Sequence, residues 1–597
     1  MGTLLQTSLQ IFQKNYKYRA TVVVLLTFFL NFSHDCLAQP ALRYSENQTP
    51  EWHEVISMYE ELDGEFEEAR LIVAGMSDAG KPIHLFIISK DREFDPEKIQ
   101  ESGKLVILIN NGIHPGESNG IDASIEFAWD LLSGTGNTAK YLDNTVILLV
   151  PVFNIGGALN RSPFNRANQN GPEEQGFRGN AQNLDLNRDF VKMDSRNART
   201  MAGIIQTWQP DLFIDTHSTN GADYPYTVTL IATHHQQMKE PLSSLIHEKM
   251  EPYLYEKMNK SPYKMCHYVN VFRTPPEDGF EGFIETPRYL AGYTAAFNIP
   301  SYTVETHMLK PYEERVHSTV YLLGEMLKFS SKHAKKIQEA RTIAEAETLA
   351  DKTQVLNWEC DREKPDRIEF TGFKTKTRMS TLTGKDMIYY DQGETWTDTI
   401  NFYNTFKPVL TVEKPDFYII PLAWTEVIDR LKISNIRMYS MDKDTSLTVE
   451  AYYIENYETL QRPANGHYWH YNTTVRKASM EVKFYKGDLM IPTDQPGAAY
   501  LVHVLEPESF DSYFSWNFFD AVLFRNEYFS PYLFESTAAE ILEKDPEMRE
   551  AFEKMKEEQS FRENPYAQLF WIYEHSDWSE PTYMRYPVFR FNGLPIY

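Results

Sequence analysis

The chain has 597 residues, of which 42% are hydrophobic and 24% are charged, and its formal net charge at pH 7 is -25. This length exceeds what a single hydrophobic core supports and predicts two or three folded units. The acidic balance argues against a nucleic-acid partner, because neutralising phosphates requires clustered Lys and Arg side chains. A solvated acidic surface is the simpler interpretation.

The first 38 residues have the pattern of a secretory signal. Lys14, Lys17 and Arg19 precede an apolar run at residues 20–32, and Cys36-Leu37-Ala38 offers a small-residue cleavage site. The run is shorter than the roughly 20 residues needed to span a bilayer. We therefore expect cleavage near Ala38 and an exported, periplasmic or extracellular, mature chain without a stable membrane span.

Alternating strand and helix patterns dominate the region up to residue 351. Apolar runs predict strands at residues 70–73, 84–88, 105–110, 144–153, 211–216, 226–232 and 301–306. Helical periodicity predicts helices at residues 52–62, 117–132, 195–208, 237–257 and 316–351. Runs that are apolar without alternation indicate burial on both faces of a sheet. The expected fold is α/β, with a mixed, mostly parallel sheet flanked by helices.

The sequence pattern changes beyond residue 351. Residues 364–496 carry short alternating strands with turn clusters and one helix near residues 424–431, which predicts a β-rich accessory domain. Helical patterns return at residues 537–559 among many aromatic side chains. We therefore expect four parts, which are a signal peptide (1–38), the α/β domain (39–351), the β-rich domain (352–505) and a helical, aromatic-rich C-terminal segment (506–597).

The stretch LVILINNGIHPGES, residues 105–118, places His114 and Glu117 directly after a buried strand. An imidazole and a carboxylate in such a turn can converge on Zn²⁺, which accepts N and O ligands at about 2.0–2.2 Å. A second His-x-x-Glu pair, His503 and Glu506, lies within and just after a strand-like run without a preceding glycine turn. We interpret that second pair as structural.

Other polar groups follow predicted strands. His217 comes immediately after residues 211–216, at the strand end where open α/β sheets bind ligands. It is either a hydrogen-bonding residue or a third zinc ligand that leaves the fourth position to water. Glu305, at the end of strand 301–306, is a candidate general base or a member of an exposed salt bridge. Asn187 and Arg188 could together hold a carboxylate.

These residues together resemble those of the zinc metallocarboxypeptidase family, the carboxypeptidase A-like peptidases. The order His-x-x-Glu, Asp-x-Asn-Arg, His and Glu matches the family's order over roughly residues 52–346. The resemblance implies that His114, Glu117 and His217 bind one Zn²⁺ per chain. It also implies that Asp185 orients His114 and that Glu305 is the general base.

The resemblance extends to substrate binding. It implies that Asn187 and Arg188 hold the terminal carboxylate of the substrate. Arg178 resembles the arginine that stabilises the oxyanion, with Arg166 as the competing candidate. Tyr289 resembles the family's substrate-capping tyrosine, with Tyr293 as the alternative. The residue that sets side-chain preference is not implied, because the segment before the catalytic Glu is shortened.

The expected function is that of an exported zinc-dependent carboxypeptidase acting on peptide or protein C-termini. One alternative is a zinc amidohydrolase or deacylase that acts on N-acyl amino acids or cell-wall peptides. Another is a non-catalytic exported binding protein whose surfaces are the aromatic clusters at residues 452–453, 468–471 and 514–516. Such aromatic residues more often form cores and domain interfaces.

The remaining histidines and cysteines give weaker signals. Neighbouring residues on a strand face opposite ways, so His234-His235 and Cys266-His267 are interpreted as structural. Export would permit a disulfide between Cys266 and Cys360 but does not require one.

Overall fold

A computed structural model describes residues 39–219, 221–271 and 274–596. The predicted secretory signal at residues 1–38 lies outside the described residues. From Arg43 onward the chain forms one structural unit. Among the helices of the described residues, none has both the length and the apolarity that crossing a membrane requires.

Within the described residues, an eight-stranded sheet has the order β1-β2-β4-β3-β5-β9-β6-β7. Its strands are β1 (Ala69–Met76), β2 (Pro82–Ile88), β3 (Leu105–Asn110), β4 (Thr145–Val150), β5 (Leu212–Thr219), β6 (Val228–Ala232), β7 (Met265–His267) and β9 (Ser301–His307). The pairings β4–β3, β3–β5, β5–β9 and β6–β7 are parallel, whereas β1–β2, β2–β4 and β9–β6 are antiparallel. The predicted mixed, mostly parallel sheet is confirmed.

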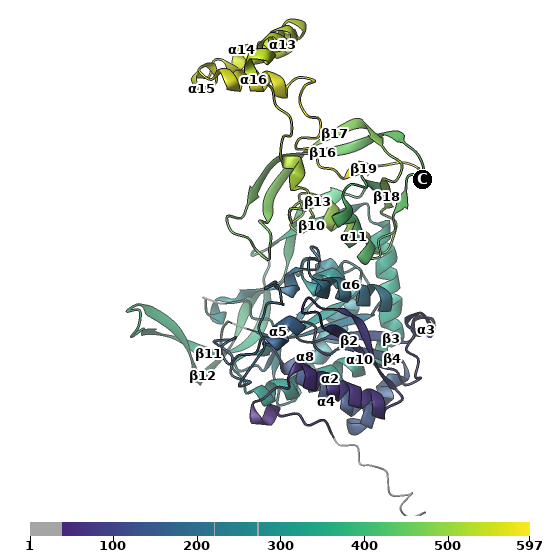
Figure 1. Cartoon of the computed structure of the whole chain (residues 1–597). Coiled ribbons are helices and arrows are strands. Elements are labelled where there is room, and N and C mark those ends of the chain that lie inside the picture. The colour runs from purple at the N-terminus through teal and green to yellow at the C-terminus, as the bar shows by residue number, and fades with distance from the viewer. Residues whose placement is uncertain (1–38, 220, 272–273, 597) are drawn as a thin grey trace, which may run out of the picture. The chain divides into compact units, whose positions relative to one another are not determined.

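Helices cover both faces of this sheet. They are α2 (Trp52–Glu65), α3 (Pro96–Glu101), α4 (Asn119–Ser133), α5 (Ile155–Leu159), α6 (Arg196–Trp208), α7 (Leu242–Leu245), α8 (Glu251–Lys260), α9 (Leu290–Ala295) and α10 (Tyr312–Ala350). Figure 1 shows α6 on one side of β2, β3 and β4, and α2 and α4 on the other. This double cover explains why every residue of β3 and β4 is buried.

The predicted helix at residues 237–257 is confirmed, although it begins and ends later. Helical backbone runs without a break from Leu242 through α7, a π-helical segment (Ile246–Met250) and α8 to Lys260. Pro252 stands in the first turn of α8. Because proline has no backbone N–H to donate to the carbonyl group four residues earlier, the regular hydrogen-bond pattern is interrupted where the π-helical segment ends.

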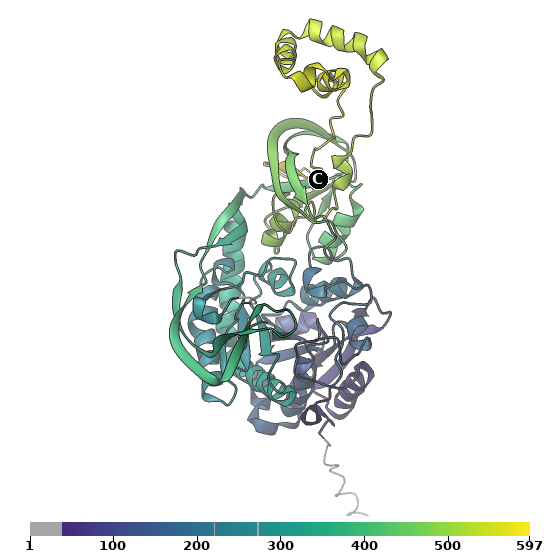
Figure 2. The same cartoon turned by 90° about the vertical axis from the view of Figure 1, so that its left-hand side faces the viewer.

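The region beyond α10 is rich in strands as far as β18, is then mainly helical, and returns to a sheet of the same region with a last short strand, β19. Its strands are β10 (Thr353–Cys360), β11 (Asp366–Met379), β12 (Asp386–Tyr403), β13 (Phe406–Glu413), β14 (Phe417–Ile420), β15 (Tyr439–Ser440), β16 (Thr445–Thr459), β17 (His470–Phe484), β18 (Leu489–Pro492) and β19 (Phe589–Phe591). Figures 1 and 2 show β11 and β12 as a long ribbon, and the short β8 (Phe280–Glu281) pairs with β12 in the same sheet. Its helices are α11 (Thr425–Ile433), α12 (Ala498–Leu505), α13 (Pro531–Lys544), α14 (Pro546–Met555), α15 (Gln559–Arg562) and α16 (Pro565–Glu574).

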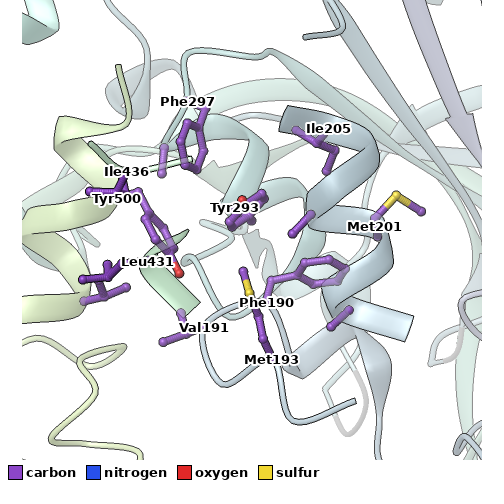
Figure 3. Close-up of a cluster of buried hydrophobic side chains, with 14 of the residues drawn as sticks. Phe190, Val191, Met193, Met201, Ile205, Tyr293, Phe297, Leu431, Ile436 and Tyr500 are labelled. Atoms are coloured by element: carbon purple, nitrogen blue, oxygen red, sulfur yellow. The ribbon is translucent and has the colours of Figure 1, made fainter. Parts of the chain in front are cut away.

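One hydrophobic core joins side chains from before and after residue 351. The ring of Tyr293, from α9, lies 5.0 Å from that of Phe297 and 5.3 Å from that of Tyr500, centroid to centroid. Figure 3 shows these rings together with Leu431 and with residues of α6. The same core holds Phe190 and Ile436 among its buried residues. The α/β sheet and the later elements are therefore stabilised by shared packing.

The second His-x-x-Glu pair and the aromatic clusters have structural surroundings. The interpretation of the run around His503 as a strand is wrong, because these residues form α12. A continuous apolar run does not distinguish a buried helix from a strand. Tyr452, Phe514 and Trp516 are each at most 2% exposed. These three rings therefore lie in cores, whereas Tyr453, Trp469 and Tyr471 are partly buried and Tyr468 is exposed.

The close packing of α4 on β5 predicts a contrast between two helical glycines. A Cβ atom at Gly120 in α4 would overlap the Thr216 side chain of β5, whereas one at Gly203 in α6 would enter open space. We expect Gly120→Ala to lower the free energy of unfolding by about 1–3 kcal/mol through overpacking. Gly203→Ala should raise it by about 0.5–1 kcal/mol. Chemical denaturation of both variants is the measurement, and equal effects would contradict the packing described here.

Candidate metal centre

His114 and Glu117 lie in the turn between β3 and α4. The Glu117 backbone N–H donates to the His114 carbonyl oxygen (2.8 Å), which closes the turn and brings the two side chains together. Gly112 enters this turn at φ 65°, a left-handed conformation that favours glycine. His114 and Glu117 are 3% and 2% exposed, so the turn holds both groups away from bulk water.

His217 and Glu305 are brought together by the pairing of β5 with β9. The parallel register places His217 opposite Glu305. The predicted end of the first of these strands at residue 216 was too early, because β5 continues to Thr219 and His217 lies inside it. The predicted position at the carboxyl end of the sheet nevertheless agrees with the structure, and it brings His217 beside the turn after β3.

The side chains of His114, Glu117 and His217 form a triangle of donor atoms. His114 Nδ1 lies 3.2 Å from His217 Nδ1, His217 Nδ1 lies 3.0 Å from Glu117 Oε2, and His114 Nδ1 lies 3.5 Å from the same oxygen. Tetrahedral ligands at about 2.0–2.2 Å from Zn²⁺ are about 3.3–3.6 Å apart, so this donor set fits that ion. Among the described residues, no other group of His, Cys, Asp and Glu side chains is so arranged.

A carboxylate lies close to the Nε2 atom of each imidazole, on the side away from the donor triangle. Asp185 Oδ1 lies 3.0 Å from His114 Nε2, and Asp215 Oδ2 lies 3.1 Å from His217 Nε2. Both rings therefore present Nδ1 to the triangle, which is how a carboxylate orients a metal-binding histidine. The position of Asp185 is predicted from the sequence, whereas that of Asp215 is not. Alternation along a strand was an available signal, because Asp215 and His217 are two residues apart and share a face.

Neighbouring charged groups set the protonation states of Glu117 and His217. Burial opposes ionisation of Glu117, but Arg166 and His114 outweigh it and hold the pKa of this carboxyl well below its usual range. Burial likewise opposes a charged His217, yet Asp215 and Glu117 raise the pKa of this imidazole well above 6.5. A cation is thus favoured at the centre of the triangle, and a bound metal ion would replace the proton.

The two candidate arginines both reach this centre. Arg166 donates from Nη1 to Glu117 Oε1 (2.6 Å) and from Nη2 to the Ser218 carbonyl oxygen (3.1 Å). Arg178 donates from Nε to Asp185 Oδ2 (3.0 Å), and its Nη1 lies 3.3 Å from His114 Nδ1. The side chain of Arg178 is 43% exposed and that of Arg166 is 11% exposed.

A cavity of about 470 Å³ opens on the triangle. Nine of the side chains singled out from the sequence line it, namely His114, Glu117, Arg166, Arg178, Asn187, Arg188, His217, Tyr289 and Glu305. Burial of the Glu305 carboxyl group raises its pKa from 4.5 to about 7. Within the described residues, Glu305 Oε2 has no hydrogen-bond partner, which leaves it available to a ligand.

The two candidate tyrosines occupy different environments. Tyr289 lines the cavity, and its ring centre lies 4.1 Å from the guanidinium carbon of Arg188. Tyr293 is fully buried in the core of Figure 3, where its hydroxyl group donates to Ser434 Oγ (3.3 Å). The structure therefore brings Tyr289 to the candidate site and places Tyr293 in the core.

Later parts of the chain hold the segments that carry these residues. Arg288, next to Tyr289, donates from its backbone N (3.1 Å) and from Nε (2.6 Å) to the Asp511 carboxylate. The backbone N–H of Asp185 donates to Asn465 Oδ1 (3.3 Å). Asn187 Oδ1 accepts from the backbone N–H of Leu290 (3.0 Å), which ties the Asp-x-Asn-Arg segment to the start of α9.

The other residues that the sequence offered as metal ligands, His234-His235, Cys266-His267 and the pair His503 and Glu506, do not line the cavity. His234 Nε2 is 3.1 Å from the Asn404 carbonyl oxygen, and burial lowers the pKa of this imidazole to about 3. The Glu506 carboxylate accepts from the Tyr418 hydroxyl group (2.6 Å). Cys266 and Cys360 are both free thiols.

Comparison with known proteins agrees with this geometry. Residues 55–268 match the family model of the zinc carboxypeptidases. This part of the chain is therefore a zinc carboxypeptidase domain, and the predicted family and enzyme class, a metal-dependent hydrolase, are confirmed. The three residues of the donor triangle lie within the matched segment, whereas Glu305 lies beyond it.

Several solved structures of low identity are similar to this chain. A metallo-carboxypeptidase from Burkholderia cenocepacia is 17% identical, with 46% of this chain and 68% of that chain covered and a TM-score of 0.35. Carboxypeptidase A from Helicoverpa armigera is 15% identical, with 51% and 78% covered and a TM-score of 0.38. No curated protein matches the sequence.

The carboxylate behind His217 predicts an effect on metal affinity. We expect Asp215→Asn to weaken zinc binding by about 10–100-fold, because the amide no longer fixes the ring orientation as a carboxylate does. The measurement is competition for zinc with a chelator of known affinity. Asp223→Asn is the matched control, since Asp223 pairs with His307 (2.9 Å) away from the triangle. Equal zinc affinity in the two variants would contradict the role of Asp215.

Proposed function

We propose that this protein is an exported zinc carboxypeptidase that removes the last residue from peptide or protein chains with a free C-terminus. The observation that carries the proposal is the donor triangle beside Glu305 in a cavity that also holds Asn187 and Arg188. Residues 39–351 would be the catalytic domain, followed by the β-rich domain (352–505) and the C-terminal segment (506–597). Export would follow from cleavage of the signal near Ala38.

The proposed metal site takes one Zn²⁺ per chain. His114 Nδ1, His217 Nδ1 and the Glu117 carboxylate would hold it, with Asp185 and Asp215 fixing the two rings. When bound, zinc lowers the pKa of a coordinated water molecule towards about 7 and polarises the scissile carbonyl group.

Glu305 is the proposed general base. Its carboxyl group lies in the cavity, and burial brings its pKa to about 7, where proton acceptance and release are both efficient at neutral pH. It would accept a proton from the attacking water molecule and pass it to the nitrogen of the leaving amine. One side chain would make both proton transfers. The register of β5 with β9 sets Glu305 opposite His217, next to the proposed metal site.

Arg178 is the proposed partner of the developing oxyanion. Both terminal nitrogens of Arg166 already donate to Glu117 and Ser218. The more exposed Arg178 lines the cavity, and Asp185 holds its Nε and Nη2, so that Nη1 is the terminal nitrogen left for a substrate. A preorganised cation at this position stabilises negative charge that appears only as the carbonyl carbon becomes tetrahedral.

Asn187 and Arg188 would bind the terminal carboxylate of the substrate. A guanidinium group can donate two parallel hydrogen bonds to a carboxylate, which restricts binding to chain ends. The ring of Tyr289, stacked on Arg188, would cover the bound residue. This arrangement distinguishes a free C-terminus from an internal peptide bond.

The role of Glu305 can be tested by Glu305→Gln. We expect this variant to bind zinc like the wild type but to lose about 10²–10⁴-fold in kcat, because the amide cannot accept the proton. The measurements are metal content of the purified protein and hydrolysis of a peptide with a free C-terminus. Turnover near the wild-type value in a zinc-loaded variant would exclude Glu305 as the base.

The carboxylate-binding role of Arg188 can be tested with peptides that differ only at the terminus. We expect the wild type to hydrolyse a free-acid peptide at least about 100-fold faster than its C-terminal amide, at equal concentration, because a lost charged hydrogen bond costs about 1.5–3 kcal/mol and Arg188 would make two. Arg188→Ala should reduce that ratio towards one. Full activity of the wild type on amidated peptides would favour the amidohydrolase alternative.

A further inference from the structure

A second acidic side chain, Glu285, lines the same cavity as Glu305. It lies in the irregular segment between β8 (Phe280–Glu281) and α9, and it is only 6% exposed. No role for Glu285 is predicted from the sequence, because no strand or helix pattern marks this segment. None of the proposed catalytic steps uses its carboxyl group.

The carboxyl group of Glu285 forms no ion pair with the described residues. Thr303 Oγ1 donates to its Oε2 (3.3 Å), and His217 and Arg188 favour its charge only from a distance, against the effects of burial and of Asp215. Burial raises the pKa of Glu285 from 4.5 to about 7. Glu117 is similarly buried, but its ion pair with Arg166 keeps its carboxyl group ionised. A buried carboxylate without a partner is costly, so the cavity favours a cation near Glu285.

The position of Glu285 relative to the catalytic groups indicates which part of a substrate would reach it. Its partner Thr303 precedes Glu305 by two residues on β9, so both side chains lie on one face, about 6.6–6.8 Å apart along the strand. Arg188, the proposed binder of the terminal carboxylate, lines the same cavity. The side chain of the last substrate residue would therefore extend past Thr303 towards Glu285.

The walls around Glu285 combine apolar and polar surfaces. Ile231 and Phe283 line the cavity together with Thr303 and Glu285. Apolar walls accommodate a methylene chain, and a charged group at its end requires an opposite charge. A long side chain with a terminal ammonium or guanidinium group satisfies both conditions, whereas an acidic side chain would meet like charge.

We propose that Glu285 selects substrates whose C-terminal residue carries a positively charged side chain, lysine or arginine. This inference rests on the proposed carboxypeptidase function and names its substrate class. Glu285 forms the ion pair with the substrate side chain at the end of the cavity, and it takes no part in bond cleavage.

The test compares two peptides that differ only in the terminal charge. One ends in lysine and the other in norleucine, which has the same methylene chain without the ammonium group. The wild type should cleave the lysine peptide with a kcat/KM at least about 30-fold higher than that for the norleucine peptide. This ratio corresponds to about 2 kcal/mol for a buried charge pair. Glu285→Gln, which keeps the shape of the side chain, should bring the ratio within about threefold while cleavage of the norleucine peptide continues.

Glu281→Gln is the matched control, because Glu281 pairs with the exposed Arg362 and does not line the cavity. It should keep the wild-type preference for lysine. The inference is overturned if the wild type cleaves the norleucine peptide as well as the lysine peptide, or if Glu285→Gln retains the preference. Failure of the zinc-loaded wild type to cleave any peptide with a free C-terminus would instead overturn the proposed function.

Discussion

The parallel pairing of β5 with β9 is the constraint on which the rest of the site depends. Its register sets His217 opposite Glu305, and the adjacent pairing of β3 with β5 brings the turn that carries His114 and Glu117 to the same edge. A shift of one residue in either pairing would turn the side chains to the opposite face of the sheet. The buried strands fix this register, because their apolar side chains fill both layers between sheet and helices.

The balance of charge around this edge follows one physical rule. Ionised groups that are removed from water are stable only with a partner, and Asp185, Asp215 and Glu117 each have an imidazole or guanidinium group nearby. Glu305 and Glu285 are the two cavity carboxyl groups whose pKa is raised to about 7. This edge of the sheet thus contains acidic groups that are paired with a cationic side chain and two that are not, and these are the groups with proposed roles at the metal and at the substrate, respectively.

Much of the fold and of the donor set could be predicted from the sequence. Uninterrupted apolar strands and the turn after residue 110 indicated both the sheet and the positions of His114 and Glu117. Other features depend on contacts that no local pattern records. The choice between Tyr289 and Tyr293 rests on which ring enters the core. The place of Glu285 depends on an irregular segment that only tertiary packing positions, and α12 resembled a strand because both are continuously apolar.

The ion pair between Arg288 and Asp511 makes the cavity dependent on residues far along the chain. Asp511 holds the backbone immediately before Tyr289, and Asn465 holds that of Asp185. One wall of the cavity is thus anchored by side chains from outside the sheet. Cutting the polypeptide after α10 would leave a sheet with its donor triangle but without these anchors, and Tyr293 would lose its packing against Tyr500. The cavity therefore depends on residues as far along the chain as Asp511, well beyond the last strand of its sheet.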